Sequence, residues 1–227
     1  MQYSTFAAID IGSYDVILEI FEISKKQGIR SVDKICHRME LGKDTYTLGK
    51  IRPEMEEELC RVLADFVRIM EGYRVDDYRA TASSAISEAS NSLYVLGKIH
   101  QLTGLSVTVL SNSEQRFLSY KALAAMEDNF NKIIEKGTAI LDLDGGSFQI
   151  SLFDKDALVT TQNIRMGSLR IRERLAGIQS ETEHYEGMVE ELIWNEVSSF
   201  KKMYLKDRKI ENIMLIGDVF TDSVYQN

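Results

Sequence analysis

Cysteine, histidine and proline are scarce in this 227-residue chain, which has two cysteines, three histidines and one proline. Cys36 and Cys60 form no CxxC pair, so they predict reduced, structural thiols rather than a zinc site. No segment approaches the roughly 20 apolar residues that span a bilayer. The first ten residues carry no basic and apolar leader. We therefore expect a cytoplasmic protein with no membrane partner.

Positive charge is also in deficit, because 35 acidic side chains face 27 basic ones and the formal net charge is −8. Such a chain lacks the overall field that attracts a phosphate backbone, so DNA is not an expected partner. Hydrophobic residues make up 44% of the sequence. That composition and length indicate a globular protein with a sizeable core, in one large domain or two small ones.

Two short segments share one pattern. Residues 7–13 read AAIDIGS and residues 139–147 read AILDLDGGS. Each pattern predicts a buried strand that runs through an aspartate into a tight Gly/Ser turn. Glycine lets backbone N–H groups approach an anion, and the aspartate can hold a metal ion or a water against a phosphate. The repetition predicts two related lobes facing one phosphate-bearing ligand.

Strand and helix patterns alternate along the rest of the chain. We predict strands over residues 7–11, 16–23, 29–39, 78–82, 105–110, 148–153, 158–164 and 213–216. We predict helices over residues 53–72, 84–101, 113–128 and 181–207, the last capped by Ser180, and a short helix from residue 168. Residues 42–50 are predicted to be a polar loop. This order predicts an α/β protein with lobes at 1–126 and 127–227, joined by a helix that runs straight into the second lobe.

Five blocks, in this order, resemble the exopolyphosphatase/guanosine pentaphosphate phosphohydrolase (Ppx/GppA) family. They are AAIDIGS, ATASSAISEASN (80–91), TGLSVTVLSNSEQRFLSY (103–120), ILDLDGGS and IRMGSLRIRERL (164–175). The resemblance implies the actin-like, ribonuclease-H-like fold of the ATPase superfamily, with mixed sheets flanked by helices and a phosphate cleft between two lobes. It also implies polyphosphate or a phosphorylated guanosine nucleotide as ligand, and magnesium-assisted attack of water on a terminal phosphoryl group.

The resemblance assigns ligand binding to the two turns. The matching residues are Asp10, Gly12, Ser13, Asp142, Gly145, Gly146 and Ser147. Asp10 and Asp142 are then the candidate magnesium ligands. Met166-Gly167 matches a further family turn, and residues 217–221 stand where the family has a last Gly/Ser/Thr-rich turn.

The positions that the resemblance links to chemistry differ from the family. Gln115 stands where the family has its glutamate base, Ser87 where it has an arginine, and Gln149 where it has another glutamate. Glutamine has no proton-accepting carboxylate, and removing a general base costs about 10²–10⁴ in rate. Asp144 replaces the first glycine of the second loop, where its charge would repel a phosphate unless a metal ion bridges them. After the first turn, Tyr14 and Asp15 replace the usual Asn and Ser.

These differences predict a catalytically impaired member, a pseudoenzyme, that keeps a phosphate-ligand cleft between its lobes. The alternative is an active magnesium-dependent phosphohydrolase that releases terminal phosphate from polyphosphate or guanosine pentaphosphate. It would use Glu114 or a substrate-held water as base, with Arg116 in place of the lost arginine. A weaker reading is an actin-like sugar or acetate kinase, which needs a better nucleotide loop near Gly217. Because family modules extend further than this chain, the second lobe is expected to expose apolar surface and to favour a homodimer or another partner.

Overall fold

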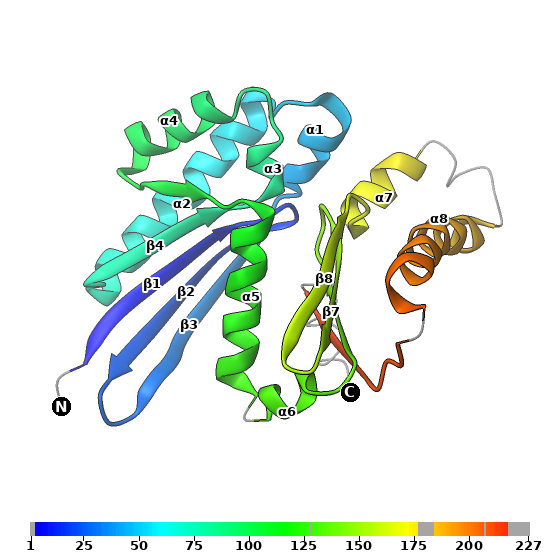
Figure 1. The fold of residues 1–227 in the computed structure, drawn as a ribbon. Coiled ribbons are helices and arrows are strands. Elements are labelled where there is room, and N and C mark those ends of the chain that lie inside the picture. The colour runs from blue at the N-terminus through cyan, green and yellow to red at the C-terminus, as the bar shows by residue number, and fades with distance from the viewer. Residues whose placement is uncertain (1–2, 128, 177–183, 207, 218–227) are drawn as a thin grey trace. The chain divides into compact units, whose positions relative to one another are not determined.

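The computed structural model describes residues 3–127, 129–176, 184–206 and 208–217. The chain forms two compact units, residues 1–112 and residues 113–227. Each unit has its own sheet (Figure 1). Each also has its own apolar core.

The first unit is built on a five-stranded sheet in the order β3-β2-β1-β4-β5. Its strands are β1 (Ser4–Ile11), β2 (Asp15–Ser24), β3 (Gly28–Arg38), β4 (Asp77–Ala82) and β5 (Val107–Val109). The hairpin predicted around Gly12 and Ser13 is confirmed, because β1 and β2 pair antiparallel with Ile11 opposite Val16. β4 runs parallel to β1 and places Thr81 beside Asp10.

Helices gather on one side of this sheet (Figure 1). They are α1 (Leu41–Leu48), α2 (Pro53–Tyr73), α3 (Ser84–Ser87) and α4 (Ser92–Thr103). The apolar face predicted for α2 is confirmed, since Leu59, Leu63 and Phe66 are buried against strand residues such as Ile9 and Leu18. Burial of these side chains removes apolar surface from water and is the main source of stability for this layer.

Three predictions in the first unit were wrong in detail. The expected loop at residues 42–50 contains α1, whose end is capped by Gly49 in the left-handed conformation. The expected helix over residues 84–101 is interrupted between α3 and α4, and β5 is shorter than predicted. α1 carries little apolar periodicity, so contacts with distant residues stabilise it rather than a local pattern.

The second unit is built on a four-stranded sheet in the order β8-β7-β6-β9. Its strands are β6 (Thr138–Leu143), β7 (Phe148–Asp154), β8 (Ala157–Ile164) and β9 (Asn212–Ile216). The helices are α5 (Asn112–Met126), α6 (Phe130–Ile134), α7 (Ser168–Leu175), α8 (Tyr185–Phe200) and the π-helix η1 (Lys201–Leu205). β6 pairs antiparallel with β7 and parallel with β9.

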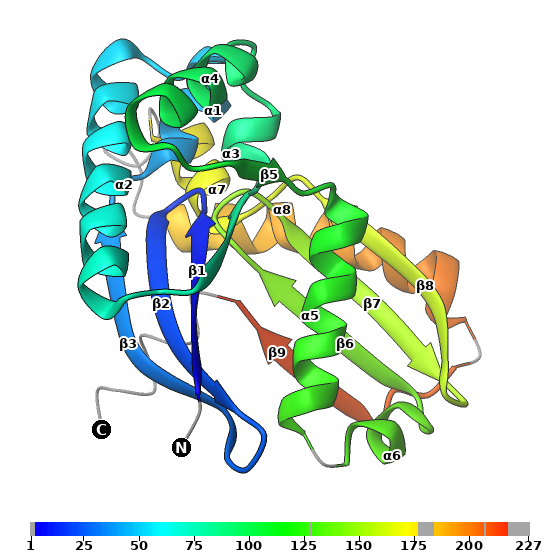
Figure 2. The same cartoon turned by 90° about the vertical axis from the view of Figure 1, so that its left-hand side faces the viewer.

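Both faces of this sheet are covered. Ile150, Leu152 and Ile164 pack with Leu175 and Phe200 on the α7 and α8 side. On the other side, Ile140 and Phe153 pack with Phe130 and Ile134 of α6, and with Tyr120 and Leu123 of α5. Figure 2 shows α5 and α6 in front of the sheet and α8 behind it.

The connection into the second unit differs from the sequence prediction. α5 does not run straight into β6, because α6 intervenes. The contacts divide the chain after Asn112, since α5 packs on the second sheet. The lobe boundary at residue 126 stays a prediction. The start predicted for the last helix, with its Ser180 cap, lies outside the described residues. No helix in the described part of the chain is long and apolar enough to cross a bilayer.

Candidate functional site

Asp10 lies on β1 close to the first turn, with its side chain exposed to solvent. The Thr81 hydroxyl donates a hydrogen bond of 3.4 Å to Asp10 Oδ1. An exposed carboxylate on a rigid strand is a suitable ligand for a hydrated divalent cation. The structure is therefore compatible with the metal-binding role predicted for Asp10.

The first turn is closed by backbone hydrogen bonds and bound to the start of α1. The Gly12 N–H donates to the Asp15 carbonyl at 2.9 Å, and a Cβ on Gly12 would approach that same oxygen to 2.9 Å. The Ser13 carbonyl accepts from the Gly42 N–H at 2.9 Å. The Tyr14 carbonyl accepts from the N–H groups of Met39 and Glu40, at 3.0 and 2.9 Å. The turn and α1 therefore form one structural unit.

The side chain of Ser13 takes part in a cluster of three hydroxyl groups. Ser13 is 5% exposed, and its Oγ lies 2.6 Å from the Tyr46 hydroxyl and 3.4 Å from Ser84 Oγ. The Tyr46 and Ser84 hydroxyls are 2.8 Å apart. Neither partner was predicted, because Ser84 stood at the start of an expected helix and Tyr46 in the expected loop at residues 42–50. The only local signal for a helix there was Gly49, a typical C-terminal cap.

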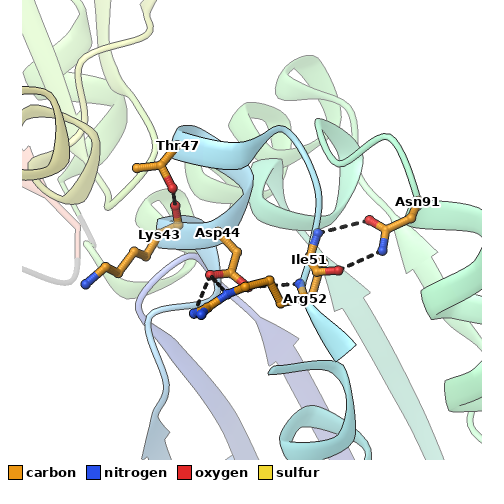
Figure 3. A network of polar contacts seen from close by, with 6 residues as sticks. All are labelled: Lys43, Asp44, Thr47, Ile51, Arg52 and Asn91. Atoms are coloured by element: carbon orange, nitrogen blue, oxygen red, sulfur yellow. Dashed lines mark hydrogen bonds and ion pairs between the residues drawn. The ribbon is translucent and has the colours of Figure 1, made fainter. Parts of the chain in front are cut away.

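α1 is fixed in place by the buried carboxylate of Asp44, which pairs with Arg52, and by side-chain contacts around it (Figure 3). The Asp44 side chain is 2% exposed and lies 2.9 Å from Arg52 Nη2, and it also accepts the Arg52 backbone N–H at 2.9 Å. The Asn91 side chain bonds both the N–H and the carbonyl of Ile51. Thr45 Oγ1 donates to the Ala85 carbonyl at 2.6 Å. These contacts hold α1, and with it Tyr46, against the first turn.

Ser87, the position matched to the family arginine, is the last residue of α3 and is exposed. Its backbone N–H donates to the Ser83 carbonyl at 3.1 Å. A neutral hydroxyl on a short side chain cannot supply the bidentate charge of a guanidinium group to a phosphate.

The second turn is organised around the carboxylate of Asp144. Asp144 Oδ1 accepts hydrogen bonds from the Gly146 and Ser147 N–H groups, both at 2.6 Å. The Asp144 N–H donates to the Ser147 carbonyl at 3.0 Å. The Ser147 hydroxyl also donates to Asp144 Oδ2 at 3.4 Å and accepts from Asn163 Nδ2 at 3.2 Å. The Gly146 and Ser147 N–H groups, in the turn that the resemblance links to phosphate, therefore bind the carboxylate of Asp144 from the same loop.

Two opposing effects act on the acidity of Asp144. Removal from water raises the pKa of the Asp144 carboxyl above its ordinary value, and this effect is the largest. The hydrogen bonds from Ser147 and Gly146 and the nearby Arg170 charge act in the opposite direction. The net pKa is raised, so the charged form is tolerated only because the loop donates to it.

The N-terminal end of α7 holds the second turn from the other side. The Gly145 carbonyl accepts from the Leu169 and Arg170 N–H groups, both at 3.1 Å, and Arg170 Nε donates to the Gly146 carbonyl at 2.9 Å. A Cβ on Gly167 would lie 2.4 Å from Gly145 C and from Ser147 N. The match of Met166-Gly167 to a family turn thus has a physical basis, because only glycine allows this approach.

Asp142 and Gln149 are direct neighbours in the second unit. They are opposite each other on β6 and β7, on the face of the sheet that α5 covers. Gln149 is buried, and Asp142 Oδ2 accepts a 3.4 Å hydrogen bond from the Ser119 hydroxyl of α5.

Gln115 precedes Ser119 by one helical turn and shares its face of α5. Gln115 is partly buried, whereas Glu114 is exposed. Neighbouring helical residues point about 100° apart. Gln115, and not Glu114, therefore lies on the face of α5 that carries Ser119. Arg116 donates to Thr161 Oγ1 at 2.9 Å and to Ser113 Oγ at 2.8 Å.

A magnesium ion fits these residues only with help from a ligand. No group of three metal-ligating side chains occurs among the residues that the structure describes. Mg²⁺ is often held by one or two carboxylates together with substrate phosphates and water, and Asp142 suits that mode. Asp144 does not, since its Oδ1 already accepts two backbone N–H groups.

Each unit therefore gathers its own set of predicted residues. Asp10, Gly12, Ser13 and Ser87 belong to the first unit. The second unit places Asp142 opposite Gln149, beside the turn at residues 144–147, and Gln115 lies one helical turn before Ser119, which bonds Asp142. Gly217 follows β9 with a φ of 125°, and a Cβ there would lie 2.0 Å from the Leu143 carbonyl oxygen. Residues 218–221 of the last turn lie outside the described residues, and the cleft between the lobes stays a prediction.

Two mixed sheets flanked by helices, each with an Asp and Gly/Ser turn after its first strand, define an α/β protein of the actin-like class. The model of the Ppx/GppA phosphatase family matches residues 19–226. The chain belongs to that family, which confirms the resemblance found in the sequence.

Relatives share limited identity with this chain. The bifunctional 3-dehydroquinate synthase/phosphatase of Fusobacterium nucleatum is 22% identical over 174 residues, which are 74% of this chain and 26% of that protein. Exopolyphosphatase 1 of Mycobacterium leprae is 25% identical over 144 residues, which are 63% of this chain and 41% of that protein. The chain thus matches well under half of the length of either relative.

Solved structures agree on the fold. The Aquifex aeolicus Ppx/GppA family member superposes with a TM-score of 0.71 at 22% identity, covering 100% of this chain and 72% of that one. The ethanolamine utilization protein EutJ of Carboxydothermus hydrogenoformans superposes with a TM-score of 0.53 at 15% identity, covering 96% of this chain and 77% of that one.

Proposed function

We propose that this chain is an exopolyphosphatase-like module with strongly impaired hydrolysis that retains binding of a phosphorylated ligand. The ligand class is polyphosphate or a phosphorylated guanosine nucleotide, held with Mg²⁺ at Asp10 and Asp142 in the cytoplasm. The observation that carries the proposal is the face of α5, where Gln115 and not Glu114 shares the side of Ser119 and its bond to Asp142. Gln115 cannot accept a proton from water, so general-base catalysis is lost.

The test is release of orthophosphate from long-chain polyphosphate and from guanosine pentaphosphate with Mg²⁺. We expect the parent chain to stay near the uncatalysed background. Gln115→Glu is expected to raise the rate by about 10²-fold, because it returns a carboxylate to the inner face of α5. Glu114→Gln is the matched control, one residue away with the reverse change, and is expected to leave the rate unchanged.

The proposal fails if the parent turns over at the rate of ordinary enzymes, about 1–10³ s⁻¹, and Asp142→Ala abolishes that turnover. Loss of activity in Glu114→Gln would then identify Glu114 as the base of an active phosphohydrolase. An unchanged rate in that variant would favour a substrate-held water.

Self-association as a homodimer belongs to the same proposal. It is supported by exposed apolar side chains on α8, such as Ile193 and Trp194. Sedimentation equilibrium tests it, and a monodisperse monomer contradicts it.

A further inference from the structure

The N–H groups of Gly146 and Ser147 form an anion-binding pair that the protein fills with its own carboxylate. Both N–H groups converge on one oxygen, Asp144 Oδ1, at 2.6 Å. Consecutive backbone N–H groups in a glycine-containing turn create a concave site for anionic oxygens. A phosphate oxygen and a carboxylate oxygen have the same acceptor chemistry towards such donors.

We propose that Asp144 is a specificity-determining residue that occupies this pair of N–H groups and thereby excludes external phosphate groups from the second turn. The inference rests on the proposed function only in its choice of phosphate as the external anion.

The loop is shaped to keep this pair of donors in place. Three of its carbonyl groups are bound by α7: that of Asp144 by the Ser168 N–H, that of Gly145 by the Leu169 and Arg170 N–H groups, and that of Gly146 by Arg170 Nε. Gly167 packs so closely that a Cβ would reach 2.4 Å from the Ser147 nitrogen. None of these contacts uses the Asp144 side chain. Removing that carboxylate would therefore leave the N–H pair aimed at the same point.

Tethering makes Asp144 a strong competitor. A ligand attached through a short link acts at an effective concentration of about millimolar or above. A free phosphate group at micromolar concentration would have to displace it. The charge of Asp144 also repels a second anion that approaches without a bridging cation.

Asp144→Gly tests the inference, because it removes the tethered carboxylate and returns a glycine to the loop. Binding of sodium tripolyphosphate is measured by calorimetry, with and without Mg²⁺. We expect at least about tenfold tighter binding than in the parent, with amide NMR shifts at Gly146 and Ser147 on titration. Asp144→Asn is expected to give a smaller gain, since its amide oxygen still accepts N–H bonds without the charge.

Asp156→Gly is the matched control. Asp156 is exposed in the turn between β7 and β8 with a φ of 60°, which glycine adopts readily. This variant loses one aspartate from the same unit, so it reports the effect of net charge alone. We expect its affinity for tripolyphosphate to equal that of the parent. Should Asp144→Gly fail to fold, Asp144→Ala removes the carboxylate with less backbone freedom.

The inference is overturned if folded Asp144→Gly or Asp144→Ala binds tripolyphosphate no more tightly than Asp156→Gly. It is also overturned if the parent already binds with shifts at Gly146 and Ser147 and the same affinity as the variant. These outcomes are distinct from failure of the proposed function, which concerns turnover. Asp144→Gly retains Gln115, so tighter binding without phosphate release is the expected result.

Discussion

The two Asp and Gly/Ser turns have similar sequences, but their polar groups are satisfied in different ways. In the first turn, the Ser13 hydroxyl bonds Tyr46 and Ser84, which come from α1 and α3. In the second turn, the Ser147 N–H bonds Asp144, three residues earlier. Asp10 keeps an exposed carboxylate, whereas the Asp144 carboxylate is turned inward onto the loop.

The contrast separates long-range from local control of a turn. Ser13 is 33 residues from Tyr46 and 71 from Ser84, so the first turn depends on helices that must already be docked. The second turn supplies its own anion, and distant residues reach it through its carbonyl groups, through Gly167 and through the Asn163 bond to the Ser147 hydroxyl. Mutations on α1 should therefore affect the first turn, and mutations at Asp144 the second.

Gly167→Ala should have the largest effect and should act on the second turn. The added Cβ would lie 2.4 Å from backbone atoms of Gly145 and Ser147, and backbone cannot rotate away as a side chain can. We expect a loss of about 3 kcal/mol, measured by urea denaturation and by amide exchange in the second unit. Gly187→Ala on α8 is the control, because nothing lies within 4 Å of its Cβ and helix propensity should stabilise it slightly. Equal effects of the two variants would contradict the close packing.

Asp44→Ala should destabilise the first unit and release α1 from the first turn. It removes a buried carboxylate that bonds the Arg52 side chain and backbone. Because Arg52 is half exposed and regains water, we expect a loss of about 2 kcal/mol. Asp65→Ala is the control, since its ion pair with Arg68 lies on the surface and contributes little. Amide exchange at residues 12–14 should become faster in Asp44→Ala only. An unchanged exchange rate there would show that the first turn does not depend on α1.

Tyr46→Phe should have a smaller effect on the same turn. The change removes the hydroxyl that links Ser13 and Ser84 while keeping the ring. A loss of about 1 kcal/mol is expected in thermal or urea unfolding. Tyr94→Phe is the control, because Tyr94 is 65% exposed. If both variants matched the parent, the hydroxyl cluster would contribute nothing to the first turn.

Asp144→Asn should change how stability depends on pH, with the smallest effect on the fold itself. The pKa of Asp144 is raised in the folded chain, so the unfolded chain gives up this proton more readily. The parent therefore loses stability as pH rises from the ordinary carboxyl pKa of 3.8 through the folded pKa. The asparagine variant should lack that decline. Urea midpoints measured between pH 3 and pH 7 test the direction of this change. The prediction is wrong if the parent gains stability relative to Asp144→Asn as pH rises across that window.

Much of the fold was predictable from local pattern. The alternation from Ala7 to Ile11 and the apolar face of α2 each indicated one structure, and the structure confirms both. α1 was not predictable, because its stabilising contacts reach Arg52 and Ala85 rather than its own neighbours. The break between α3 and α4 was missed for a similar reason, since Asn91 leaves the helix to bond Ile51.

The residues of the candidate site could be predicted from the sequence, but their contacts could not. Motif order identified Asp142, Gln115 and Asp144 as the informative positions of the second unit. The direction of Gln115 followed from helical geometry once Ser119 was seen to contact Asp142. The bonds of Asp144 did not follow, because a carboxylate in a glycine loop can face solvent, a metal or the loop itself.

The sequence by itself determined the family, the alternation of strands and helices, and the absence of a carboxylate at residue 115. These properties depend on residue type and local order, which do not change when the chain folds. Only the tertiary structure decided that Tyr46 and Ser84 hold Ser13, and that Asp144 fills the N–H pair of its own turn. The Ser13 contacts join residues that lie far apart in the sequence. The Asp144 carboxylate can rotate to several positions, and the sequence alone does not specify which one it takes.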